Sequence, residues 1–197
     1  MKSTDLILAS GSPRRIEMMK KKGFNPVVMP ARIEESLPFV MDMETSVMYL
    51  AFKKALWTEK ALSQKEKENA PIIIAADTIV YTDRIIGKPS SEDDAVEILK
   101  ELRSSQHFVA TGVCLLQAGK PARRLFYDVT EVFFKDISDA AIKAYVKTEE
   151  PYDKAGGYAI QGTFGKYVDH IHGDYENVIG FPWTMIEKEL AIFRSFS

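Results

Sequence analysis

The chain has 197 residues, of which 46% are hydrophobic and 11% aromatic, so it can bury a sizeable core and is not a disordered chain. Its 26 Lys and Arg residues against 28 Asp and Glu residues give a formal net charge of −2. That balance provides no overall reason to bind nucleic acid or an anionic membrane. The length predicts one domain over residues 1–197, with room for two lobes that share a core.

The single cysteine and the short apolar runs indicate the cellular compartment of the protein. Cys114 is the only cysteine, so no disulfide can form within the chain, and its apolar neighbours favour a small buried residue over a nucleophile. No apolar stretch approaches the ~18 residues that span a bilayer. The four apolar residues at 6–9 are too few for the core of a signal peptide. We therefore expect a cytoplasmic protein that does not enter a membrane.

The first half of the chain predicts strands and helices in alternation. Ser12 and Pro13 are suited to begin a helix that reaches about Lys22, where Gly23 would stop it. Thr45 is a candidate cap for a second helix to about Leu62, whose apolar stripe includes Lys54. We expect strands at 6–9, 26–30 and 71–76, the second at a sheet edge and the third central, and a solvated loop at 63–69.

The second half of the chain predicts both hairpins and helices. Residues 79–81 and 85–86 flank a turn, and Ser90 or Ser91 can cap a helix that follows. Further elements are expected as strands at 107–117, 124–134, 158–162 and 166–171, helices at 138–147 and 182–193, and a loop at 173–182. Hairpins together with strand–helix units indicate an α/β fold with a mixed sheet, unlike the strict alternation of a Rossmann fold.

The segment from Ser10 to Arg15 has the features of a phosphate site. It follows a predicted strand and opens a predicted helix, whose free backbone N–H groups attract anions. Arg14 and Arg15 add bidentate donors, and the hydroxyls of Ser10 and Ser12 can donate as well. A capped helix with solvated arginines explains the same spacing, and the two readings are about equal on spacing alone. The Walker A pattern of P-loop enzymes is absent.

Two charged residues stand out among apolar neighbours. Lys54 lies within the apolar helical stripe, which is costly unless its ammonium reaches solvent or an anion, whereas Lys53 should face outward. Asp77 follows a strand with no polar residue from Pro71 on. A carboxylate at such a strand end can hold Mg²⁺ or take a proton from water, although an Asp that caps the next turn fits as well.

Two further segments could contact a nucleotide. Lys88 lies in a Gly-Lys-Pro sequence, which alone most often marks a loop. Gly156 and Gly157 permit close backbone approach, and the amide of Gln161 can both donate to and accept from a nucleobase edge. No zinc-type spacing and no serine-hydrolase nucleophile motif occurs, which removes the common hydrolase nucleophiles.

Taken in order, these segments resemble the Maf family of nucleoside-triphosphate pyrophosphatases over almost the whole chain. Each segment is weak alone, but the ordered set is specific. It comprises LASGSPRR at 8–15, Ile33-Glu34-Glu35, Leu50-Ala51 with Lys54-Ala55, AADTIV at 75–80, GKP at 87–89, TGV at 111–113, KAGGYAIQG at 154–162 and GDYENVIGFP at 173–182.

The resemblance implies a curved mixed β-sheet with flanking helices, two lobes around a cleft, similar to the inosine-triphosphate pyrophosphatases. It implies hydrolysis of a nucleoside triphosphate to the monophosphate and diphosphate with a divalent cation, Mg²⁺ or Mn²⁺. Asp77 matches the proton acceptor, and the Asp77-Thr78 pair is similar to the branch that acts on dTTP and UTP. The implied substrate-binding residues are Ser10, Arg14, Arg15, Lys54, Thr78, Lys88 and Gln161, and the candidate metal ligands are Glu35 and Asp77.

Two other functions use the same residues. One is a nucleotide-binding regulator of cell division without turnover, and the other is a pyrophosphatase for 7-methyl-GTP, whose branch usually has Asp-Gln in place of Asp77-Thr78. We expect a nucleoside triphosphate as the partner, and neither nucleic acid nor membrane. The sequence leaves open whether the chain forms a homodimer and whether Asp77 is the base, a metal ligand or both.

Overall fold

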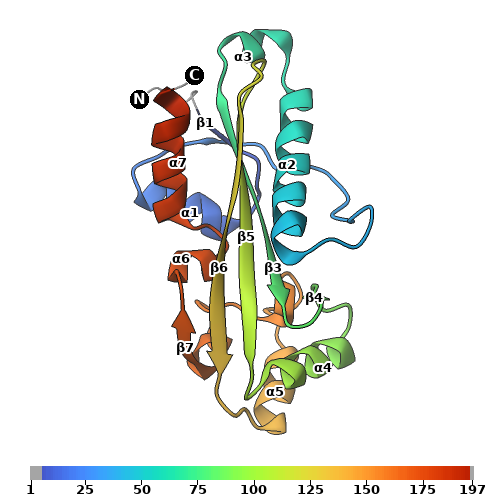
Figure 1. Cartoon of the computed structure of the whole chain (residues 1–197). Coiled ribbons are helices and arrows are strands. Elements are labelled where there is room, and N and C mark those ends of the chain that lie inside the picture. Colours follow the sequence, from blue (N-terminus) through green and yellow to red (C-terminus); the bar gives the residue numbers. More distant parts are fainter. Residues whose placement is uncertain (1–5, 196–197) are drawn as a thin grey trace. The chain divides into compact units, whose positions relative to one another are not determined.

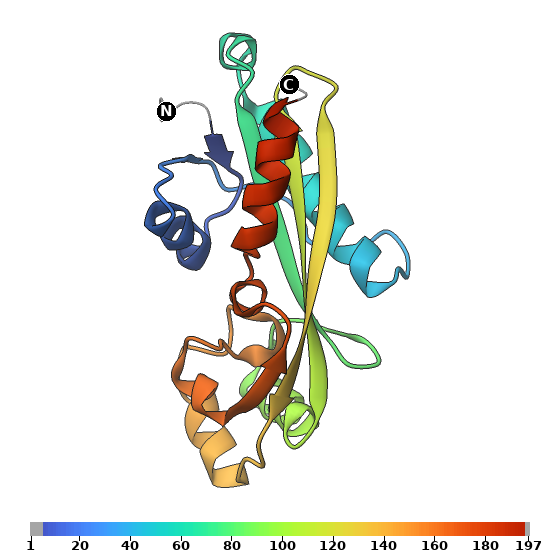
Figure 2. The same ribbon diagram turned by 60° about the vertical axis from the view of Figure 1, so that its left-hand side comes forward.

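The computed structural model describes residues 6–195. These fall into two compact units, which Figures 1 and 2 show in two views. The first unit comprises the described residues of segments 1–77, 111–128 and 180–197, and the second comprises segments 78–110 and 129–179. Each unit is described by itself below.

A mixed sheet of seven strands provides the frame of the fold. The strand order is β2-β1-β3-β5-β6-β7, and β4 pairs with β3. β1 (Leu6–Leu8) is parallel to both β2 (Val27–Val28) and β3 (Ile72–Tyr81), whereas β4 (Ile85–Ile86) is antiparallel to β3. β5 (Gln106–Gln117) and β6 (Arg123–Phe134) follow, and β7 (Val168–His172) is antiparallel to β6. The predicted α/β class with a mixed sheet and flanking helices is confirmed.

In the first unit, helices cover both faces of the sheet. α1 (Pro13–Lys21) follows β1 and ends near Gly23, whose φ of +84° only glycine adopts readily. α2 (Met43–Ala61) and the last helix, α7 (Trp183–Ser195), lie on opposite sides of the strands in Figures 1 and 2. The predicted helix at 182–193 is confirmed as α7. The predicted edge strand within 26–30 is confirmed as β2, which stands at one end of the strand order.

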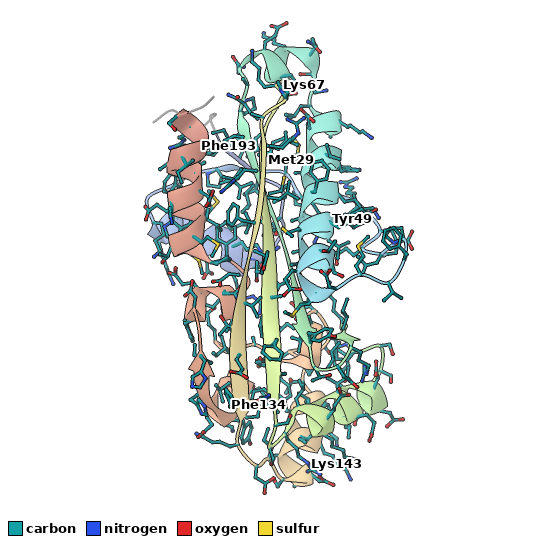
Figure 3. The ribbon with its side chains drawn as sticks, viewed as in Figure 1. Met29, Tyr49, Lys67, Phe134, Lys143 and Phe193 are labelled. Carbon is teal, nitrogen blue, oxygen red and sulfur yellow. The ribbon has the colours of Figure 1, made fainter. Side chains whose placement is uncertain are left out.

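Small residues let α2 approach the sheet closely. Its inward face includes Ala51 and Ala55, which pack in one buried cluster with Ala75 of β3 and Cys114 of β5. Met29, labelled in Figure 3, packs against the edge of this cluster. Gly112 of β5 faces the helix so closely that an added Cβ would lie 2.3 Å from the carbonyl carbon of Val47. The predicted apolar stripe of this helix is confirmed.

The second unit has its own core of aliphatic and aromatic side chains. α4 (Glu92–Leu102) contacts α5 (Asp139–Val146) and the 3₁₀ turn η1 (Ala155–Gly157). A second 3₁₀ turn, η2 (Thr163–Tyr167), leads into β7, and α6 (Tyr175–Ile179) follows. Phe134, labelled in Figure 3, is a buried member of this core. Ser91 caps α4 and Ser138 caps α5 as predicted, each by accepting a backbone N–H bond.

Two predictions in the first half of the chain are wrong in detail. The cap of α2 is Asp42, whose Oδ1 accepts a 2.7 Å hydrogen bond from the backbone nitrogen of Thr45. The predicted loop at 63–69 contains α3 (Gln64–Glu68). There the hydroxyl of Ser63 accepts from the backbone of Glu66, and the Glu66 carboxylate accepts from the backbone of Ser63. This reciprocal capping stabilises a polar helix that hydrophobic periodicity does not detect.

Three further predictions differ from the structure. β3 does not end before Asp77 but runs on to Tyr81, because Val80 and Tyr81 pair with β4. The predicted strand at 158–162 is absent: Gly162 donates to the carbonyl of Ala159, so this backbone bonds locally instead of to a neighbouring strand. The loop at 173–182 contains a short helix, α6, between Gly173 and Gly180.

Two properties of the described residues complete the fold. Cys114 is buried, and burial raises the pKa of its thiol to about 12, so it is a packing residue as predicted. Between residues 6 and 195, no helix combines the length and the hydrophobicity that crossing a bilayer requires.

Candidate active site

The turn from β1 into α1 places Ser10 and Arg15 together in the first unit. The guanidinium of Arg15 is buried and donates to three oxygens: the carbonyls of Gly180 and Ala76, each at 2.8 Å, and the hydroxyl of Ser10 at 3.2 Å. Arg15 therefore ties α1 to β3 and to the segment before α7. Sequence patterns could not identify the two carbonyls, because any residue supplies one.

Burial lowers the pKa of Arg15 from its ordinary value, while the nearby carboxylate of Asp77 acts in the opposite direction. The charge of Arg14 adds to the lowering and that of Glu35 opposes it, so four charged groups influence one another around Arg15. The side chain of Arg14 is half-buried and has no hydrogen-bond partner among residues 6–195. Since Arg15 is already bonded to protein oxygens, Arg14 is the arginine of this pair that is suited to an anion.

Lys54 joins two carboxylates at the centre of the site. Its Nζ lies 2.5 Å from Oδ1 of Asp77 and 2.7 Å from Oε1 of Glu35. The side chains of Lys54 and Asp77 are only 10% and 8% exposed, whereas that of Glu35 is 45% exposed. A buried ammonium needs such partners, since an unpaired charge in a protein interior is very costly. Of the two alternatives for Lys54, an ammonium that reaches solvent and an ammonium with an anionic partner, the structure shows the second.

The local sequence explains why Lys54 and Asp77 lie next to each other. Side chains alternate along a strand, so Ile73, Ala75 and Asp77 point to the same side of β3. Ile73 and Ala75 lie in the cluster beneath α2, and Asp77 continues their row. On the helix, Lys54 follows Leu50 and Ala51 by one turn on the buried face. The charged pair therefore extends a packed apolar interface.

Lys53, which was predicted to face outward, makes exposed hydrogen bonds that the sequence did not suggest. It is half-buried, and its Nζ donates to the backbone carbonyl of Glu34 at 2.8 Å, with the carbonyl of Ser36 at 3.5 Å. These carbonyls flank Glu35, whose carboxylate contacts the next lysine along the helix. Lys53 is therefore a support for the loop that carries Glu35, and no sequence signal marked it because its partners are backbone atoms.

The residues present fit a divalent cation of the magnesium type. Glu35 and Asp77 each place a carboxylate oxygen within hydrogen-bonding distance of the same Lys54 nitrogen, so the two carboxylates lie close enough together to share a cation. Mg²⁺ in nucleotide enzymes is commonly held by one or two carboxylates together with substrate phosphates. A site made by protein alone is not what these residues form: among residues 6–195 no group of three His, Cys, Asp or Glu side chains converges.

The remaining candidates belong to the second unit. Thr78 is half-buried on β3, directly after Asp77 in the chain, and Lys88 and Gln161 are exposed. The segments that carry the last two are joined, because Gly156 donates to the carbonyl of Gly87 at 3.0 Å. An added Cβ at Gly157 would lie 3.1 Å from Pro89, so these glycines allow the close approach that the sequence suggested.

Comparison with known proteins identifies the family of this chain. The profile described as "Maf-like protein" matches residues 5–193. A protein of Caldicellulosiruptor bescii named dTTP/UTP pyrophosphatase is 42% identical over 178 residues, which cover 90% of this chain and 88% of its own. A protein of Acetivibrio thermocellus with the same name is 40% identical over 189 residues, covering 95% and 94% of the two chains.

A solved structure, that of the Staphylococcus aureus Ham1 protein, aligns over 93% of this chain and 98% of its own, with 14% identity and a TM-score of 0.49. The family profile spans nearly all of the chain and includes every residue of the Ser10, Arg15, Glu35, Lys54 and Asp77 cluster. By that match and by the two relatives, the chain belongs to the Maf-like protein family.

Proposed function

We propose that the protein hydrolyses nucleoside triphosphates between the α- and β-phosphates, and that dTTP and UTP are its preferred substrates. The observation that carries the proposal is the buried Lys54–Asp77 pair, with Glu35 beside it, in a chain of the Maf-like family. Relatives at about 40% identity have the name dTTP/UTP pyrophosphatase.

Asp77 is the proposed proton acceptor. The oxygen of a water molecule forms a bond to the α-phosphorus, the bond from that phosphorus to the bridging oxygen breaks, and diphosphate leaves. A proton of the water passes to the carboxylate of Asp77, which Lys54 orients through the 2.5 Å contact. Because Lys54 already has two carboxylate partners, a bound phosphate would compete with them for the same ammonium.

The start of α1 is the proposed phosphate site. Proline at position 13 has no N–H, and the side chain of Ser12 makes no capping hydrogen bond to the first turn of the helix, although the backbone N–H of Ser12 donates to the hydroxyl of Ser10. Arg14 supplies a guanidinium that can bind two phosphate oxygens. Arg15 already donates to three protein oxygens, so its proposed role is to fix the positions of Ser10, β3 and α1 around the phosphates.

Glu35 and Asp77 are the proposed ligands of Mg²⁺ or Mn²⁺. When bound, a divalent cation supplies charge neutralisation for the triphosphate and for the departing diphosphate. Lys53 keeps the backbone on either side of Glu35 in place, so it supports this carboxylate indirectly. We further propose a cytoplasmic location, where nucleoside triphosphates are made and a buried free thiol such as that of Cys114 is ordinary.

Thr78, Lys88 and Gln161 are the proposed substrate-binding residues of the second unit, on the strength of the family resemblance. Uracil and thymine present an acceptor, a donor and an acceptor along one edge, and a side-chain amide can bond to two of these groups. Cytosine reverses two of the three, so a site built for uracil would leave polar groups unpaired. Each buried mismatch costs about 1–3 kcal/mol, or roughly 5- to 150-fold in discrimination.

A screen of purified protein tests this proposal. Diphosphate release is measured with dTTP, UTP, CTP, GTP and 7-methyl-GTP, in Mg²⁺ and in Mn²⁺ and with a chelator as the blank. We expect kcat/KM to be highest for dTTP and UTP, lower for CTP and lowest for the purines. Binding of a nucleotide without release of diphosphate would support the regulator instead, and 7-methyl-GTP as the best substrate would overturn the branch assignment.

A further inference from the structure

A buried hydrogen bond links β5 to the glycine-rich segment of the second unit. Nε2 of His107 lies 2.7 Å from the hydroxyl of Tyr158, and both residues are almost fully buried. Their rings meet edge-on, with centroids 5.5 Å apart and planes at 86°. Phe134 of β6 completes the contact, with its ring centroid 4.9 Å from that of His107 and 4.8 Å from that of Tyr158. The two polar groups therefore meet inside an aromatic core.

This bond is costly to bury and has no part in the chemistry proposed above. Burial lowers the pKa of His107 to about 4 and raises that of Tyr158, so both side chains are neutral near pH 7. A Phe–Leu pair would fill a similar space without any polar group to satisfy. What the bond supplies in addition to packing is a fixed position for Tyr158.

Tyr158 lies between two parts of the proposed substrate segment. Immediately before it, Gly156 and Gly157 turn with φ of +69° and +68°, and an added Cβ at these positions would lie 2.8 Å from Val80 and 3.1 Å from Pro89. Three residues after it comes the exposed Gln161. No strand pairing holds residues 158–162, since their hydrogen bonds are local turns. The hydroxyl of Tyr158 is therefore a direct side-chain tether from this irregular segment to the sheet.

We propose that His107 and Tyr158 are positioning residues for base selection: their hydrogen bond fixes the segment 156–161 and, through it, the amide of Gln161. This rests on the proposed function, in which Gln161 contacts the base. A looser segment would hold the amide less well over the pyrimidine edge. It would reduce the preference for dTTP over CTP, because discrimination depends on polar groups that are held in place.

Tyr158→Phe is the decisive variant, since it removes one oxygen atom and keeps the ring in the core. We expect the ratio of kcat/KM for dTTP to that for CTP to fall by about 3- to 10-fold, the range for loss of one neutral hydrogen bond. The change should come mainly from a higher KM for dTTP, with kcat within about twofold because Asp77 and Lys54 are untouched. His107→Gln retains an amide that can reach the tyrosine hydroxyl, and it should keep more of the ratio than His107→Leu.

Tyr152→Phe is the matched control. Its hydroxyl donates to the carbonyl of Val146 at 2.6 Å, so this variant also removes a hydrogen-bonded oxygen from a tyrosine that packs against the same core. We expect it to lower the melting temperature without changing the dTTP:CTP ratio. The proposal is overturned if Tyr158→Phe lowers the melting temperature but leaves the ratio unchanged, or if Tyr152→Phe changes the ratio equally. Absence of diphosphate release from the unaltered protein would instead overturn the proposed function.

Discussion

The Nζ atom of Lys54 lies 2.5 Å from Oδ1 of Asp77, and the helix and strand that carry them meet through alanine side chains. Two charges so deeply buried stabilise each other, but the pair adds little net stability, since both have left water. Removal of one partner is costly, because the other charge then remains buried without a counter-ion. Such a pair is better explained by chemistry at the site than by stability of the fold.

Asp77→Asn tests the proton acceptor directly. The amide keeps the shape of the carboxylate but cannot take a proton from water, so we expect turnover to fall by at least ~10²-fold, while nucleotide still binds. Diphosphate release and binding of dTTP are measured on the same preparation. Asp93→Asn, which changes an exposed carboxylate in the first turn of α4, is the charge-matched control and should keep normal turnover. Turnover near the normal rate in Asp77→Asn would remove Asp77 from this role.

The two adjacent lysines of α2 should have effects of different size. Lys54→Ala removes the ammonium between two carboxylates, and we expect kcat/KM to fall by more than about 10-fold. Lys53→Ala removes only exposed bonds to the carbonyls beside Glu35, which are worth about 0.5–1 kcal/mol, so kcat/KM should fall by roughly 2- to 5-fold.

Lys60→Ala, an exposed lysine on the same helix, is the control for loss of charge and should have no effect. A titration with Mg²⁺ distinguishes the roles further. If Lys53 supports Glu35, then Lys53→Ala should need more Mg²⁺ for half-maximal activity than Lys60→Ala. Equal Mg²⁺ requirements for these two variants would show that the contacts of Lys53 do not affect Glu35.

Gly112→Ala tests the close approach of α2 to the sheet. The new Cβ would lie 2.3 Å from the carbonyl carbon of Val47, a distance that requires the helix to move. Overpacking of this kind costs about 1–3 kcal/mol, and a shift of α2 would also separate Lys54 from Asp77. We expect lower unfolding free energy in urea together with lower turnover. Gly87→Ala is the stability control, because no atom lies within 4 Å of its added Cβ, and similar losses in both variants would contradict this account.

Much of the fold follows from sequence patterns that depend only on near neighbours. Strand β1, the proline at the start of α1 and the apolar stripe of α2 each have such a signal, and each is where it was predicted. One exception, α3, has no apolar periodicity. α3 is stabilised by capping between Ser63 and Glu66, so a polar segment that read as a loop is helical.

The residues of the candidate site also divide into those that a sequence pattern reveals and those that it does not. Lys54 and Asp77 were recognisable because each is a charge in an apolar pattern, and burial of such a residue calls for a partner. The roles of Arg15 and Lys53 were not recognisable, because both bind backbone carbonyls that come from distant segments. Any sequence offers such carbonyls at every residue, so only the fold reveals which ones are within reach.

His107 should make stability sensitive to acid, and the sign follows from its pKa. Burial lowers this pKa from 6.5 to about 4, so between these pH values the unfolded chain binds a proton at His107 that the folded protein does not bind. Stability therefore falls as the pH drops from about 6.5 to 4, and between pH 7 and pH 5 the share of His107 is about 2 kcal/mol. His107→Gln has no such group, whereas its other titrating groups are unchanged. The free energy of unfolding in urea is measured for the unaltered protein and for His107→Gln at pH 7 and pH 5. Its decrease from pH 7 to pH 5 should be about 2 kcal/mol smaller in His107→Gln, and equal decreases would mean that His107 titrates normally in the folded protein.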